Sequence, residues 1–167
     1  ALISVRNSSE VYKVSAECLD DLLEKIISEG IKNLPAAISY KSSSKCLKNP
    51  IKGLNSIFDV EICAYVLNLV SGNNVSFQTI FERTLGMNFP IESTDSSAGQ
   101  MSLFDTVSND DKMKEIASET LLGVYVAVKQ NMEIVAKKLE TLLFSIEFPL
   151  VLTLDNIERN GMYVSSE

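Results

Sequence analysis

The chain has 167 residues, 46% of them hydrophobic, and its 22 acidic against 15 basic side chains give a formal net charge of −7. This length and hydrophobic content predict one globular domain of ordinary size. The acidic balance argues against strong binding to a nucleic-acid backbone, which needs at least a local surplus of Lys and Arg.

The N-terminal part of the chain predicts a hairpin followed by a helix. Hydrophobic residues alternate in 2–5 and again in 11–14, on either side of the polar stretch 7–10, which is typical of a β-hairpin. Ser15 can N-cap the helix that follows, and Gly30 ends it. The apolar stripe of this helix is formed by Leu19, Leu22, Leu23, Ile26 and Ile27.

Three short elements are predicted next. Residues 36–40 form an apolar run of strand length. Residues 42–44 open a short helix that ends before Pro50. Residues 57–58 form another short strand.

Two stronger helices follow. Asp59 is predicted to N-cap a helix that runs through Val70, and we interpret its carboxylate as a cap rather than as a metal ligand. Ser76 and Gly86 bound a second helix over 77–85. The expected core residues of the first helix are Ile62, Cys63, Val66, Leu67 and Val70.

A long polar stretch, 88–110, separates these helices from the last part of the chain. Only the string Gln-Met-Ser-Leu-Phe at 100–104 interrupts its polarity. A loop of this length inside a domain is usually functional or disordered. From 111 to about 144 the pattern is helical again. Early strands with helices between and after them predict an α/β fold.

The residue types present limit the chemistry of the chain. There is no histidine, which excludes Ser-His and Cys-His nucleophiles and a histidine general base, and argues against a zinc site. Cys18, Cys46 and Cys63 have no metal-like spacing, and each lies among apolar neighbours. We therefore expect buried thiols in a reducing compartment.

The C-terminal part carries two specific strings, Ile-Glu-Phe-Pro-Leu at 146–150 and Ile-Glu-Arg-Asn-Gly-Met-Tyr-Val at 157–164. Pro149 suits a first helical turn, and Gly161 supplies a left-handed residue after the last one. One helical face is predicted to hold Leu150, Leu154 and Ile157. Together the strings resemble the junction in A-family DNA polymerases, the bacterial DNA polymerase I type, where the 3′-5′ exonuclease domain leads into the polymerase domain.

The resemblance extends over most of the chain. Residues 57–68 resemble the family's F-D-T helix, 77–86 its short helix ending in Leu-Gly, and 112–150 its last exonuclease helices. It implies that 1–148 form a degenerate 3′-5′ exonuclease-like domain. Its fold would be RNase H-like, with a short mixed sheet flanked by helices. This sheet would lack the usual first strand. Residues 149–167 would begin the polymerase (thumb) region.

The same resemblance implies a lost active site. Active members hold two metal ions with acidic residues in three motifs, the first of which lies on the missing strand. The second motif, N-x-x-x-D, falls on Ser39 and Ser43, or on Ile38 and Ser42 if the alignment shifts by one. No carboxylate is present in either alignment.

The third motif, Y-x-x-x-D, falls on Glu115 and Glu119, so that only Glu119 keeps a metal-binding group. One carboxylate cannot hold two metal ions. We therefore expect no metal and no cofactor in this fragment, while Mg²⁺ would serve the parent polymerase.

The leading functional hypothesis is a catalytically inactive exonuclease-like domain that supports its own polymerase domain in DNA replication and repair. This hypothesis implies a monomer in the bacterial cytoplasm near the nucleoid. The net charge predicts that the fragment alone binds DNA only weakly, and no apolar run approaches the roughly 20 residues that a membrane helix needs.

Two alternatives remain open. Residues 100–104 resemble a sliding-clamp docking peptide, with Gln100, Met101, Leu103 and Phe104 as the contacts. The same Leu103 and Phe104 could instead pin the loop to the domain. The other alternative is an active metal-dependent 3′-5′ exonuclease, with the missing strand supplied elsewhere.

Overall fold

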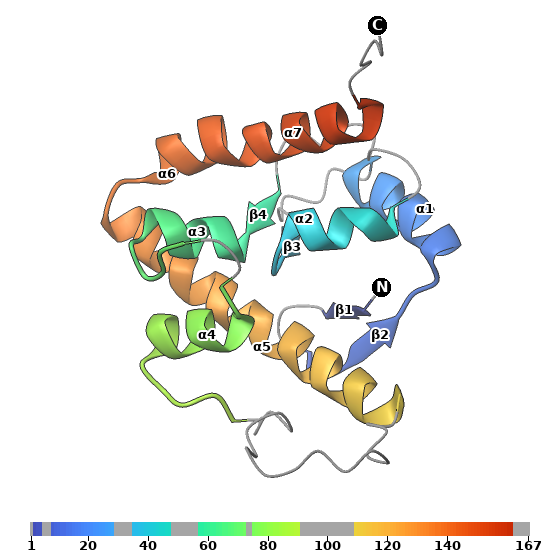
Figure 1. Cartoon of the computed structure of the whole chain (residues 1–167), viewed down its shortest axis with the longest axis horizontal. Coiled ribbons are helices and arrows are strands. Elements are labelled where there is room, and N and C mark those ends of the chain that lie inside the picture. The colour runs from blue at the N-terminus through green and yellow to red at the C-terminus, as the bar shows by residue number, and fades with distance from the viewer. Residues whose placement is uncertain are drawn as a thin grey trace, which may run out of the picture.

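Helices make up most of the structure, and two small two-stranded sheets complete an α/β fold (Figure 1). This computed structural model describes residues 2–4, 8–28, 35–47, 57–72, 75–90 and 109–161. The predicted α/β class is confirmed. Among the described residues the strands form two separate pairs, one antiparallel and one parallel, rather than a single mixed sheet.

The predicted N-terminal hairpin and helix are both present. Strand β1 (Leu2–Ser4) pairs antiparallel with β2 (Val11–Lys13), and helix α1 (Ala16–Ser28) follows. The Ser15 hydroxyl oxygen accepts the N–H of Cys18 at 3.3 Å, as expected of an N-cap. The predicted stop at Gly30 lies outside the described residues.

The second sheet differs from the sequence prediction. Strand β3 (Ala36–Ala37) pairs in parallel with β4 (Phe58–Asp59), and helix α2 (Tyr40–Ser43) leads into the 3₁₀ turn η1 (Ser44–Cys46). The predicted strand over 36–40 is therefore too long, and the helix begins two residues earlier than expected. The cause is tertiary, because the Asp59 side chain accepts the N–H of Tyr40 and turns the chain there.

Helix α3 (Val60–Val66) is shorter than predicted, whereas α4 (Phe77–Leu85) matches its prediction. The α3 stop is Asn68, which adopts the left-handed conformation with φ 57°. The N–H of Leu69 bonds to the carbonyl of Ala64 at 2.9 Å, and Asn68 bonds to Tyr65 at 3.0 Å. This is a Schellman motif, so the expectation that the helix continues through Val70 was wrong.

The last part of the chain contains four consecutive helical segments. They are α5 (Asn109–Ala136), α6 (Glu140–Leu142), the π-helical segment η2 (Leu143–Glu147) and α7 (Phe148–Asn160). The predicted helix over 111–144 is interrupted because Lys138 also adopts a left-handed conformation, with φ 57°. The N–H groups of Lys138 and Leu139 bond to the carbonyls of Val135 and Ile134 in a second Schellman motif.

Side chains from β4, α3, α4, α5, η2 and α7 form the larger of two hydrophobic clusters. Its members that are at most 1% exposed are Val60, Cys63, Ala64, Ile80, Val126, Ile134, Leu143 and Phe148. The smaller cluster comprises Leu19, Tyr40, Leu47 and Ile57. In Figure 1, α7 crosses one end of the molecule with α3, β4 and α2 beside it.

The predicted core of α3 is confirmed in part. Cys63, Leu67 and Val70 are buried, while Ile62 and Val66 are partly buried against the cluster. The expectation for the thiols fails at Cys18, which is exposed on α1. The side chain of Cys46 lies outside the described residues.

The π-helical segment places α7 on the core. Leu143 and Phe148 are five residues apart and both have 0% exposure, which a π-helix allows because its repeat is longer than that of an α-helix. The Phe148 ring then lies 5.4 Å from the Phe58 ring and 5.3 Å from the Phe144 ring, between centroids. In the described ranges, no helix is both long and apolar enough to cross a membrane.

Lys138→Gly should raise the free energy of unfolding by about 0.5–1 kcal/mol, because glycine relieves the strain of a positive φ while the unfolded chain gains some freedom. Urea denaturation measures the change. Lys129→Gly, inside α5, is the matched control and should lower the same free energy by about 1 kcal/mol. Destabilisation by both variants would contradict the left-handed conformation at 138.

Candidate functional site

The predicted second-motif residues lie at the two ends of α2. Ser39 is the N-cap residue and makes no side-chain cap bond, while Ser43 is exposed in the last turn. The Ser43 hydroxyl donates to the carbonyl of Ser39 at 2.9 Å. The hydroxyl of Ser43 is thus used by its own helix.

The predicted third-motif residues, Glu115 and Glu119, lie one turn apart on α5 and are both half-buried. Burial raises the pKa of the Glu119 carboxyl, and the charge of Glu115 adds to the shift.

The two motif regions meet where Ile38 crosses α5. A Cβ built on Gly123 would stand 3.1 Å from the Ile38 side chain, so glycine permits the close approach. Ser39 follows Ile38, and Glu119 precedes Gly123 by one helical turn. Within the part of the chain that the structure describes, no group of three or more Cys, Asp or Glu could hold a metal ion.

The proposed clamp-docking string is not part of the described structure. Gln100, Met101, Leu103 and Phe104 all fall in the range 91–108, so docking through them stays a prediction.

Asp59, Tyr40, Asp155 and Arg159 form what we call the polar joint, which is centred on the buried Asp59 (2% exposed). The sequence predicted that Asp59 caps α3, but not that it also bonds to α2. Its Oδ1 accepts the N–H of Ile62 at 3.0 Å, and its Oδ2 accepts the N–H of Tyr40 at 2.7 Å. Burial raises the pKa of the Asp59 carboxyl, and these two N–H groups oppose that shift. One carboxylate therefore caps both α3 and α2.

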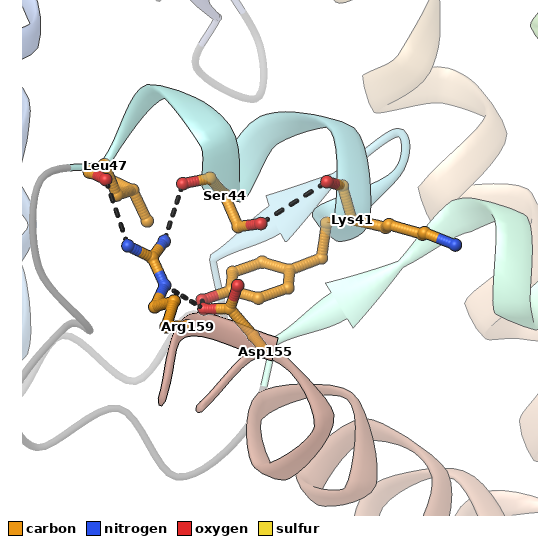
Figure 2. Close-up of polar contacts among 6 residues, drawn as sticks. Lys41, Ser44, Leu47, Asp155 and Arg159 are labelled. Carbon is orange, nitrogen blue, oxygen red and sulfur yellow. Dashed lines mark hydrogen bonds and ion pairs between the residues drawn. The ribbon is translucent and has the colours of Figure 1, made fainter. Parts of the chain in front are cut away.

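The joint continues from Tyr40 to Asp155 of α7. Figure 2 shows Asp155 beside Arg159, whose guanidinium group faces Ser44 and Leu47. The Tyr40 hydroxyl donates to Oδ2 of Asp155 at 3.3 Å, and Nε of Arg159 donates to the same oxygen at 2.9 Å. The other guanidinium nitrogens of Arg159 donate to the carbonyls of Ser44 at 2.7 Å and Leu47 at 3.2 Å. Arg159 thus satisfies carbonyl groups where η1 ends, the position at which a cation is favourable.

These contacts define what the joint can do chemically. The Asp59 carboxylate accepts from backbone N–H groups, and the Arg159 guanidinium donates to Asp155 and to backbone carbonyls. Polar groups that are satisfied within the protein in this way have a structural role, which here is to hold α7 against η1. The sequence does hold a signal for the α7 part, since Asp155 and Arg159 have the i, i+4 spacing of a helical ion pair. The contacts of Tyr40 are to Asp59 and Asp155, which are 19 and 115 residues away, and they depend on the parallel pairing of β3 with β4. The residues next to Tyr40 in the sequence therefore do not predict them.

The side of α7 that carries Asp155 and Arg159 faces the protein, and the opposite side is apolar and exposed. We call this the outer α7 face: Ile146 near the end of η2, and Leu150, Leu154 and Ile157 of α7, which are 54%, 46%, 49% and 55% exposed. The sequence correctly placed the last three on one helical face. That face points to solvent, because Phe148, Val151 and Leu152 occupy the side that packs on the two clusters. The outer α7 face is the candidate functional site.

Comparisons with known proteins return no match. No protein-family model matches the chain, and no curated protein and no solved structure matches it.

Asp59→Asn should lower the free energy of unfolding by about 2–3 kcal/mol, because the amide keeps one acceptor and turns an NH₂ group toward an N–H donor. Ser76→Ala is the control. It removes the cap bond from the N–H of Thr79 on α4, together with the exposed hydrogen bond between the Ser76 and Thr79 hydroxyls, and should cost about 1 kcal/mol. Chemical denaturation of both variants gives the comparison, and equal losses would mean that only one helix depends on Asp59.

Stability should depend on Tyr40 at alkaline pH. Burial, followed by the charge of Asp155, raises the pKa of Tyr40 to about 12 from 10.0. The unfolded chain then loses the phenol proton before the folded chain does, so the contribution of Tyr40 is complete below pH 10 and declines between pH 10 and 12.

Tyr40→Phe provides the readout for this titration. At neutral pH the variant should be less stable by about 1 kcal/mol, the loss of one hydrogen bond. The difference between the two proteins should shrink as the pH rises above 10, because only the unmodified chain ionises there. A difference that stays constant from pH 8 to alkaline pH would show that the phenol is not held by Asp155.

Proposed function

We propose that this chain is a catalytically silent 3′-5′ exonuclease-like domain of an A-family DNA polymerase, RNase H-like in fold, and that it braces the polymerase domain joined to it. The observation that carries the proposal is the outer α7 face. It lies in the segment whose residues resemble the exonuclease–polymerase junction, where a neighbouring domain would begin. The proposal places the protein in the bacterial cytoplasm, near the nucleoid.

The bracing role follows from the two sides of α7. The inner side is fixed by the packing of Phe148 on Phe58 and by the bonds from Arg159 to Ser44 and Leu47. The four outer side chains are each about half exposed. Covering them with a domain surface would contribute on the order of 1 kcal/mol each. A helix that is apolar on both sides is expected between two packed bodies.

Loss of catalysis is supported by the side chains at the motif positions. Ser39 and Ser43 stand where the resemblance expects metal-binding groups, and hydroxyls are weaker ligands for a hard cation than carboxylates. Glu119 is the one carboxylate that the resemblance keeps at a metal-binding position, and one carboxylate cannot hold two metal ions. Mg²⁺ would therefore act at the polymerase active site of the parent protein rather than in this domain.

A nuclease assay tests the silent site. Incubation of 5′-labelled single-stranded DNA with the chain and Mg²⁺ or Mn²⁺ should leave the DNA intact, because a single carboxylate cannot clamp two metal ions. Glu119→Gln is the matched control and should behave identically. Degradation that the Glu119→Gln substitution abolishes would contradict the proposal and favour an active exonuclease.

The bracing role is tested in the parent protein. Leu150→Glu and Leu154→Glu together should lower the thermal transition of the polymerase by several degrees, because they place two charges in the proposed domain contact. The same pair in the isolated 167-residue chain should change the transition little, since both side chains are exposed there. A parent gene without a polymerase domain, or an unchanged transition, would overturn the proposal.

A further inference from the structure

The side chain of Gln130 is buried in the middle of the inner side of α5. Its exposure is 0%, and so is that of Val126 and Ile134, which lie one helical turn before and after it. These residues follow one line along α5, on the side that packs against α3 and α4 (Figure 1). Because glutamine is seldom fully buried, its place in an otherwise apolar line requires a physical reason.

The Gln130 amide joins α5 to both neighbouring helices. Its Nε2 donates to the carbonyl of Val60, in the first turn of α3, at 3.2 Å, and lies 3.5 Å from the hydroxyl oxygen of Thr84 on α4. Val60 and Thr84 are themselves buried, with 1% and 4% exposure. A carbonyl can only accept a hydrogen bond, so this contact determines which end of the amide faces α3.

The other end of the same amide is not paired. The Oε1 atom of Gln130 is buried, and among the described residues it accepts no hydrogen bond. A hydrogen bond within a protein contributes less to stability than the burial of an unpaired polar atom costs. An apolar side chain of similar length would avoid that cost. Stability alone therefore does not explain a glutamine at this position.

The apolar line leaves the position of α5 along its own axis weakly defined. Sliding α5 by one turn, about 5.4 Å, would bring Val126 or Ile134 opposite the Val60 carbonyl. Hydrophobic burial is non-directional, so it distinguishes poorly between these positions. Gln130 does distinguish them, because after the slide its amide would be buried beyond hydrogen-bond distance of Val60. Single buried polar side chains fix the register of paired helices in this way, at a cost in stability.

A second contact marks the same position of α5. Ile38, next to β3, crosses α5 at Gly123, where an added Cβ would stand 3.1 Å from the Ile38 side chain. A slide of one turn would bring Glu119 or Ala127 to this crossing, and their Cβ atoms would crowd Ile38. The same register is therefore favoured from the β3 side and from the α3 side.

We propose that Gln130 is a register determinant, which fixes the position of α5 along its axis through the directional bond to Val60. The competing state is a shift of α5 by one turn past α3 and α4, a kind of movement that packed helices make in switching proteins. The inference is independent of the proposed exonuclease origin, since it depends only on contacts of α5 within this chain.

Gln130→Met in the full 167-residue chain separates register from stability, because methionine has a similar length and no amide. The thermal transition should stay the same or rise by a few degrees, since the unpaired Oε1 is removed. Methyl relaxation-dispersion NMR should nevertheless reveal microsecond-to-millisecond exchange, or a second set of signals, at Val126, Ile134 and Ile38. This is the timescale of helix register shifts, and the unmodified chain should show no such exchange.

Ile134→Met is the matched control, one turn further along the inner side of α5. It leaves the Gln130 amide in place, so the methyl groups of Val126 and Ile38 should show no exchange. Its thermal transition should fall slightly, because a packed aliphatic side chain is replaced by one of different shape.

Two results would overturn the proposal. A thermal transition that falls further in Gln130→Met than in Ile134→Met would mean that Oε1 is paired and that Gln130 acts through stability. Methyl groups without exchange and with a single set of signals in Gln130→Met would mean that packing alone fixes the register.

Discussion

The carboxylate of Asp59 is the group on which the arrangement of this protein depends. It ends β4, begins α3 through Ile62, and begins α2 through Tyr40, so three elements meet at two oxygen atoms. Burying a carboxylate is costly, and the N–H groups that it accepts offset that cost only if β3 and β4 stay paired. The short parallel pair and the two helix starts therefore support one another.

The same group determines, through Tyr40, how α7 is held. Tyr40 contacts Asp155 and Arg159, and Arg159 in turn bonds to the carbonyls of η1. Phe148 packs beside this joint on Phe58, the residue before Asp59. The inner side of α7 is thus fixed by polar and aromatic contacts together. Its outer side can remain apolar and exposed without loss of the helix, and this combination is the basis of the proposed bracing role.

Features set by neighbouring residues could be predicted from the sequence. The caps at Ser15, Asp59 and Ser76 and the glycine stop of α4 follow from side-chain chemistry within three or four residues. The stops at Asn68 and Lys138 could not be predicted, because these residues adopt left-handed conformations that glycine usually takes.

The candidate site shows the same division between local and tertiary information. Helical spacing grouped the residues of the outer α7 face, yet periodicity does not tell a core face from a docking face. That distinction came from the π-helical segment and from Phe148, which direct the other side of α7 into the protein.

Native-state hydrogen exchange tests most directly whether Asp59 holds this joint together. With Asp59→Asn, the account predicts that the amides of α2 and of the last two turns of α7 lose protection together, by a larger factor than those of α4. Loss of protection in α2 while α7 keeps its own would contradict the account.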